Sequence, residues 1–151
     1  MIDWMNQRAH RAWWCCVVVC LIASACGKAE YGEKGVVVRG RIVQNGEPLP
    51  LDRPDVGLGV VELKLIPQGA TDAIDFASAR GDGKFEFIGE GQGVKPGTYR
   101  LAVLHYKSGP GTDELQGKLD ETNTQITLTV PADQMGDAYD AGDVELSEHL
   151  Q

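Results

Sequence analysis

Cysteine and tryptophan are scarce in this chain of 151 residues, and both are confined to its beginning. The four cysteines are Cys15, Cys16, Cys20 and Cys26, and the three tryptophans are Trp4, Trp13 and Trp14. A disulfide framework needs cysteines spread through the domain that it holds together. The residues after Cys26 must therefore be held by a hydrophobic core, which a segment of their length can supply.

Basic residues are also few. Lys and Arg total 14 against 22 Asp and Glu, which gives a net charge of −8 at pH 7. A protein that binds nucleic acid normally carries a basic stripe that neutralises phosphates. Nucleic acid is therefore not expected as a partner.

The chain has no apolar run of the length that a membrane-spanning helix needs, which is about 20 residues. Its longest uncharged run covers 12–27, which is 16 residues, and it follows Arg8 and Arg11. A positive start, a short apolar run and small residues at the end of that run are typical of an export signal. Residues 1–25 are therefore predicted to be a signal peptide.

The residues around Cys26 make this signal more specific. The segment LIASACG at 21–27 resembles a bacterial lipobox, with small residues at Ser24 and Ala25. Cleavage after Ala25 would leave Cys26 as the first residue, carrying a diacylglycerol on its sulfur and fatty acyl chains such as palmitate. An ordinary secretory signal cleaved after Ala25 and an uncleaved anchor helix are the alternatives.

Processing at Cys26 has consequences for location and partners. It removes Arg8, Arg11 and Asp3, so 12 basic and 21 acidic residues remain. The chain is then expected to be a monomer on a bacterial membrane, at the outer membrane or on the periplasmic face. Gly27 favours the outer membrane, because an Asp after the cysteine retains lipoproteins in the inner membrane of some bacteria. Residues 26–35 are polar and glycine-rich, as in a short flexible tether.

The rest of the chain shows the alternation of β-strands and no long amphipathic helix. Turn residues such as Asn45-Gly46 and Asp82-Gly83 separate the alternating runs. Residues 131–142 are acidic and are expected to be irregular. The seven predicted strands cover 36–43, 59–66, 74–80, 85–88, 99–106, 126–130 and 144–146. Together they predict an all-β, seven-stranded antiparallel sandwich.

Four segments resemble a known module in their order and spacing. They are GRIVQNGEPLP, ARGDGKFEF, KPGTYRLAV and GKLDETNTQI, and the resemblance covers 35–146. They resemble the carboxypeptidase regulatory-like domain, a transthyretin-like and Ig-like sandwich, and especially single-domain bacterial lipoproteins that carry it. The resemblance implies a sandwich over 36–148 with a tail at 149–151. The segment LDRPDVGL at 51–58 departs from the pattern by lengthening the connection to the second strand.

The residues that follow the signal give no catalytic constellation. Their histidines are His105, expected to be half-buried in a strand, and His149, close to the chain end. No zinc-protease helix motif and no Gly-x-Ser-x-Gly elbow is present. Arg80-Gly81-Asp82 is explained by turn chemistry rather than adhesion. We therefore predict no catalytic residue, cofactor or metal ligand, and Cys26 as the lipidation site.

One acidic cluster leaves a question open. Its members are Asp133, Asp137, Asp140 and Asp143. Carboxylates are the ligands that calcium prefers, but their spacing does not match an EF-hand loop. A solvated loop is the simpler interpretation.

These observations together predict a non-enzymatic, lipid-anchored cell-envelope protein whose β-sandwich serves structure or protein interaction. The alternative is a ligand-binding module for carbohydrate or peptide. The missing tryptophans argue against carbohydrate, because sugar-binding sandwiches usually expose aromatic side chains. Fold alone does not decide between these functions.

Overall fold

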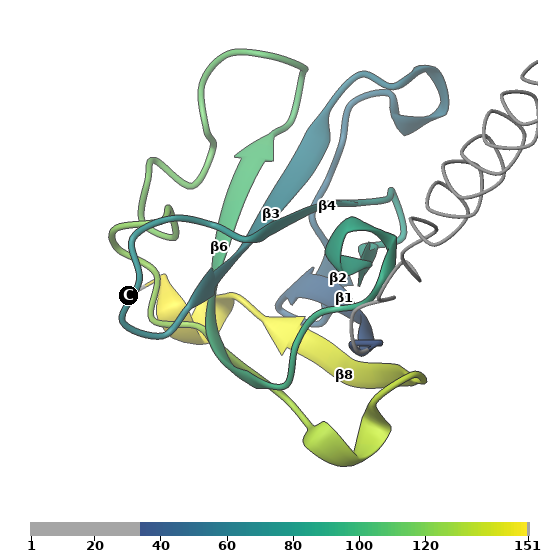
Figure 1. Ribbon diagram of the computed structural model, residues 1–151. Helices are drawn as coiled ribbons and strands as arrows, with labels where there is room; N and C mark the ends of the chain where they lie inside the picture. The colour runs from purple at the N-terminus through teal and green to yellow at the C-terminus, as the bar shows by residue number, and fades with distance from the viewer. Residues whose placement is uncertain (1–33, 151) are drawn as a thin grey trace, which may run out of the picture. The chain divides into compact units, whose positions relative to one another are not determined.

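The computed structural model describes residues 34–150 (Figure 1). The predicted signal peptide, Cys26 and nearly all of the tether lie outside these residues. The described strands are β1 (Val37–Gln44), β2 (Glu47–Pro48), β3 (Val60–Pro67), β4 (Asp75–Ala79), β5 (Lys84–Phe87), β6 (Gly97–Tyr106), β7 (Thr127–Val130) and β8 (Ala138–Glu145). The helices among these residues are short 3₁₀ turns, η2 (Pro54–Val56), η3 (Gly89–Gly91), η4 (Ala132–Gln134) and η5 (Ser147–His149).

The strands form two four-stranded sheets, so the all-β, two-sheet class is confirmed. In the first sheet β1 pairs with β2, β5 and β8. The second sheet has the order β4-β3-β6-β7 and is antiparallel throughout. Strands β4 and β5 are joined by a tight turn but belong to different sheets, so this hairpin links the two layers.

Two details of the predicted fold are wrong: the described residues contain eight strands rather than seven, and one pairing is parallel. Strand β2 is a two-residue edge strand, which is where a proline such as Pro48 is tolerated. Strand β8 begins at Ala138, inside the stretch expected to be irregular, and runs parallel to β1. Residues 131–137 connect the second sheet to the first and bring Ala138 beside Val37, so both strands run in the same direction.

The core lies between the sheets and is built by side chains from alternate positions of each strand. In β7 and the residue before it, Ile126, Leu128 and Val130 are buried while Thr127 and Thr129 are exposed, as the alternation predicts. Phe85 and Phe87 both enter the core from β5, with ring centroids 5.5 Å apart in an edge-to-face arrangement. The largest fully buried side chains include Phe87, Ile42, Leu63, Leu65, Ile66, Leu101, Leu119 and Leu146.

Tyr99 occupies the core with its hydroxyl satisfied. The side chain is 5 % exposed, and its hydroxyl donates to the carbonyl of Lys95 at 2.7 Å. A buried tyrosine bonded to backbone a few residues upstream is the arrangement of the tyrosine corner in β-sandwiches. Burial raises the pKa of Tyr99, which keeps the hydroxyl protonated as a donor.

The turn between β1 and β2 holds the end of β8. Asn45 and Gly46 have φ of 55° and 80°, which places both in the left-handed region of a type I′ turn and confirms the turn predicted from Asn-Gly. Their N–H groups donate to the two carboxylate oxygens of Glu145 at 2.8 and 2.9 Å. Ser147 donates to the same carboxylate from its hydroxyl at 2.6 Å and from its N–H at 2.9 Å. These bonds, led by the Ser147 hydroxyl, lower the pKa of Glu145 to about 2.

Replacement of Glu145 by glutamine should change how stability depends on pH. The folded state lowers the pKa of Glu145, so the ionised group stabilises the fold above its ordinary pKa, and this is lost as pH falls toward about 2. Urea unfolding between pH 7 and pH 2.5 should therefore show a smaller acid-dependent loss in Glu145→Gln than in the wild type. The exposed Glu148→Gln should behave like the wild type, and equal acid dependence in all three proteins would contradict the role of Glu145.

Candidate functional site

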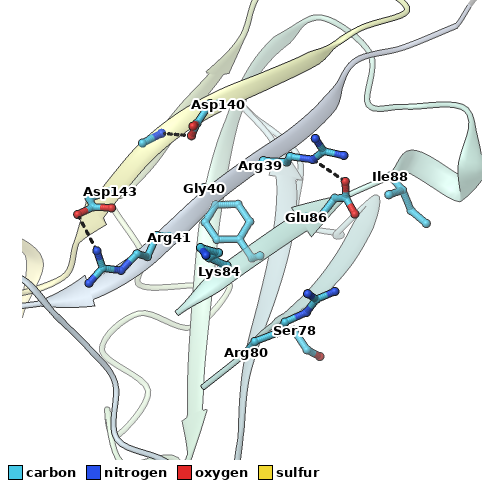
Figure 2. Close-up of a pocket in the computed structure, with 12 residues that line it drawn as sticks. Arg39, Gly40, Arg41, Ser78, Arg80, Lys84, Glu86, Ile88, Asp140 and Asp143 are labelled. Carbon is cyan, nitrogen blue, oxygen red and sulfur yellow. Dashed lines mark hydrogen bonds and ion pairs between the residues drawn. The ribbon is translucent and has the colours of Figure 1, made fainter. Parts of the chain in front are cut away.

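A groove of about 690 Å³ crosses the outer face of the first sheet (Figure 2). It extends over β8, β1 and β5 and reaches β4 of the second sheet, because the β4–β5 hairpin brings that strand alongside. Its volume is within the range of small-ligand sites, roughly 300–1,000 Å³. The charged side chains that line it are Arg39, Arg41, Arg80, Lys84, Glu86, Asp140 and Asp143, and Ser78 and Ile88 complete its rim.

The strand register sorts these charges into two rows. In one row Arg41 lies opposite Lys84 of β5 and opposite Asp143 of β8. Arg80 lies beside Lys84, because its N–H donates to the Lys84 carbonyl at 2.9 Å across the hairpin. Arg41, Lys84 and Arg80 therefore follow one another across β1, β5 and the end of β4 at the hairpin end of the groove, and we call these three residues the basic row.

The basic row is only weakly neutralised. Asp143 lies 3.6 Å from the Arg41 guanidinium, and Asp82 lies 3.1 Å from the Lys84 ammonium. No ion pair among residues 34–150 includes Arg80. Exposed pairs of this kind contribute little, about 0–1 kcal/mol. Like charges directly opposite each other on a sheet are destabilising, so Arg41 and Lys84 are placed at a cost to the fold.

The second row of the groove contains one cation, Arg39, and two carboxylates, Glu86 and Asp140. Arg39 lies opposite Glu86, and its Nε donates to the Glu86 carboxylate at 2.7 Å. Asp140, opposite Arg39 on β8, accepts a bond from the Gly142 N–H at 2.9 Å. The groove is therefore acidic by one charge toward the start of β1 and basic toward the β4–β5 turn.

The Arg80-Gly81-Asp82 segment is built as a turn, as predicted. Gly83 donates its N–H to the Arg80 carbonyl at 2.8 Å, and the Lys84 N–H donates to the Asp82 carboxylate at 3.1 Å. The backbone bond from Lys84 is the main reason that the pKa of Asp82 is lowered. Asp82 thus stabilises the turn. Arg80, at the start of the turn, lines the groove.

His105 is more buried than the sequence suggested, at 4 % exposed rather than half-buried. Its Nε2 lies 2.8 Å from the Pro50 carbonyl, and because a carbonyl only accepts, this nitrogen carries the proton. The backbone N–H of His105 donates to Asp113 at 2.8 Å. His105 lines a second, smaller hollow of about 500 Å³, which shares no lining residue with the groove. His149 is exposed in η5.

The late acidic residues do not converge. Asp133 lies in η4 and Asp140 and Asp143 are spaced along β8, where they face Arg39 and Arg41. Within 34–150 no three Asp, Glu, His or Cys side chains lie close enough to hold a metal ion. The calcium interpretation therefore gains no geometric support from the described residues, and two of the four aspartates belong to the groove.

The groove was not predicted from the sequence. A signal was present, since Arg39 and Arg41 occupy alternate positions of the first predicted strand, and Arg80 and Lys84 flank the predicted turn. The sequence does not say which strands are neighbours, so it could not bring the two pairs together. The predicted lipidation site, Cys26, lies outside the described residues.

Comparison with known proteins adds no relative. No protein-family model matches the chain, and no curated protein matches its sequence. The resemblance to the carboxypeptidase regulatory-like domain therefore stays a hypothesis that rests on its motifs. Among residues 34–150, no helix has the length and apolar character to cross a membrane.

Proposed function

We propose that this protein is a non-catalytic binding domain of a bacterial cell envelope, anchored by lipid at Cys26 and built on a carboxypeptidase regulatory-like sandwich. Its groove binds an acidic segment of a partner protein. The observation that carries the proposal is the basic row, in which Lys84 lies opposite Arg41 on one side and beside Arg80 on the other. A bound carboxylate relieves this repulsion, and arginine recognises carboxylates with paired hydrogen bonds.

The lining favours a peptide over a carbohydrate. Sugar-binding faces rely on exposed aromatic rings, which supply large contact areas. The aromatic side chain that lines the groove is Phe85, and it is 4 % exposed because its ring enters the core. Charge-assisted hydrogen bonds are therefore the main attraction that this groove offers.

The arrangement of the groove favours binding over catalysis. Hydrolysis needs a nucleophile or metal-bound water, a base and charge stabilisation in one pocket. The groove contains Ser78 but no histidine or cysteine among its described lining residues. Two of the carboxylates that line the groove, those of Glu86 and Asp143, are engaged in ion pairs with Arg39 and Arg41.

Titration with a hexaglutamate peptide tests the proposal. The full chain should bind it, and Arg80→Glu/Lys84→Glu should weaken binding by at least about tenfold, which corresponds to about 1.4 kcal/mol. The control is Lys95→Glu/Lys118→Glu, which changes two exposed lysines outside the groove by the same total charge. It should stay within about twofold of the wild type. Measurement near 0.15 M salt limits repulsion from distant carboxylates, because the screening length is then about 8 Å.

Three outcomes distinguish binding of an acidic peptide in the groove from its alternatives. Loss of binding in the groove variant alone supports the proposal. Equal weakening in both variants would show only a general charge effect and would contradict it. Binding of a neutral oligosaccharide in place of the peptide, unaffected by Arg80→Glu/Lys84→Glu, would favour the carbohydrate alternative and also contradict it.

A further inference from the structure

Exposed large apolar side chains gather around the point where the chain enters the domain. Among the described residues six such side chains are at least 42 % exposed. Four of them, Ile74, Phe76, Ile88 and Met135, lie on segments that hydrogen bonds link, directly or through the loop after Ile88, to Gly35. We call these four residues the entry rim. Single exposed apolar residues are ordinary, whereas a group in one region marks an interaction surface.

Hydrogen bonds hold the segments of the entry rim together. Gly35 donates its N–H to the Gln92 carbonyl at 2.6 Å, in the loop that follows Ile88. The Gly136 N–H, next to Met135, donates to the Gly35 carbonyl at 2.9 Å. The carboxylate of Asp75, between Ile74 and Phe76, accepts from the Gly89 N–H at 2.7 Å.

The entry point itself is tightly packed. Gly93 has φ of 86°, and a Cβ on it would lie 2.4 Å from the Gly35 carbonyl carbon. Two backbones can approach this closely only where neither residue has a side chain. The position of Gly35 is thus fixed relative to the loop that follows Ile88.

We infer that the entry rim lies in the interfacial layer of the bilayer to which Cys26 anchors the chain; the inference rests on the proposed lipid anchor. Cys26 precedes Gly35 by nine residues, and such a segment spans at most about 30 Å. A domain of this size has a radius of gyration of about 13 Å. The tether therefore holds Gly35 within about 30 Å of the bilayer, and apolar side chains around Gly35 are the first of the domain that can reach the lipid surface.

The chemistry of the rim fits a zwitterionic lipid surface. Phenylalanine, isoleucine and methionine are apolar, and apolar area inserted at the acyl boundary contributes binding energy. Both signs of charge flank the rim, with Lys34 and Lys95 on one hand and Glu90 and Asp137 on the other. A strongly anionic surface would repel the processed chain, which keeps 12 basic and 21 acidic residues.

This placement orients the groove. Strand β5 is antiparallel to β1, so Phe87 lies opposite Val38 near the entry point and Lys84 lies opposite Arg41 at the far end. With the entry rim on the bilayer, the basic row is at the end that points away from the membrane. The proposed acidic partner then reaches the basic row from the side away from lipid, while Ile88, at the other end of the groove, lies at the bilayer.

Single tryptophan probes test the inference, since residues 26–151 contain no tryptophan. The lipid-anchored chain carrying Ile88→Trp is placed in phosphatidylcholine vesicles that contain brominated acyl chains. Its fluorescence should be quenched by at least about half. The control is Val56→Trp, because Val56 is 53 % exposed against 48 % for Ile88. Val56 belongs to η2, beside the far β4–β5 turn, where a Cβ on Gly81 would lie 3.2 Å from Pro54. Val56→Trp should not be quenched.

The possible outcomes distinguish a failure of the entry-rim inference from a failure of the proposed lipid anchor. A chain that floats with the vesicles while Ile88→Trp and Val56→Trp are equally unquenched would overturn the entry rim and leave the anchor intact. A chain that stays in the aqueous fraction would overturn both. Phe76→Trp, at a position 64 % exposed, gives the same measurement should Ile88→Trp fail to fold.

Discussion

Replacement of Leu128 by alanine is expected to lower the free energy of unfolding by about 2–5 kcal/mol. Leu128 is 5 % exposed and belongs to the core cluster between the two sheets. It lies opposite Tyr99, which limits how far the neighbours can close the cavity. The loss therefore combines the transfer of the removed carbons to water with the cost of the space that they leave, and urea unfolding measures it directly.

Thr127 provides the matched control on the same strand. Its side chain is exposed, so Thr127→Ala should cost less than about 1 kcal/mol. Adjacent residues of a strand point to opposite faces, and the ratio of the two costs reports which face is buried. Equal losses for the two variants would mean that the assignment of faces in β7 is wrong.

Replacement of Cys26 by serine is expected to abolish lipid attachment. Cells fed an alkyne analogue of palmitate should label the wild-type chain, and the signal from Cys26→Ser should fall to background, because a hydroxyl does not replace the thiol in this modification. The matched control is Cys20→Ser, which removes a cysteine from the same apolar run. Labelled Cys26→Ser, or loss of label in Cys20→Ser as well, would contradict Cys26 as the site.

Local patterns of the sequence were sufficient for most strands. The alternation of Ile126, Leu128 and Val130 with two threonines gave the correct buried face, and Asn45-Gly46 and Asp82-Gly83 gave correct turns. Each of these predictions depends on the chemistry of a few neighbouring residues, namely the two-residue period of a strand and the ease of positive φ in a turn.

Most of strand β8 could not be predicted in the same way, although its last two residues belong to the strand predicted at 144–146. Its sequence contains Asp140, Gly142 and Asp143, which have low strand propensity. They are tolerated because β8 is an edge strand, where charge also discourages pairing with other chains. Its parallel direction follows from the path of residues 131–137 between the sheets, which no local pattern records.

The groove depends on the same non-local information. Arg41 and Lys84 are 43 positions apart, and only the antiparallel register of β1 and β5 places them opposite each other. Arg80 joins them because the β4–β5 hairpin links the sheets. The sequence shows these three cationic residues, but only the strand register shows that Arg41 and Lys84 lie opposite each other.

The mass of the intact chain, purified from membranes, tests most directly that this domain is displayed on a membrane. The account predicts a chain that begins at Cys26 and carries the added mass of a diacylglyceryl group, with or without a further acyl chain. A chain that begins at Met1, or one that begins at Cys26 with a free thiol, would contradict it.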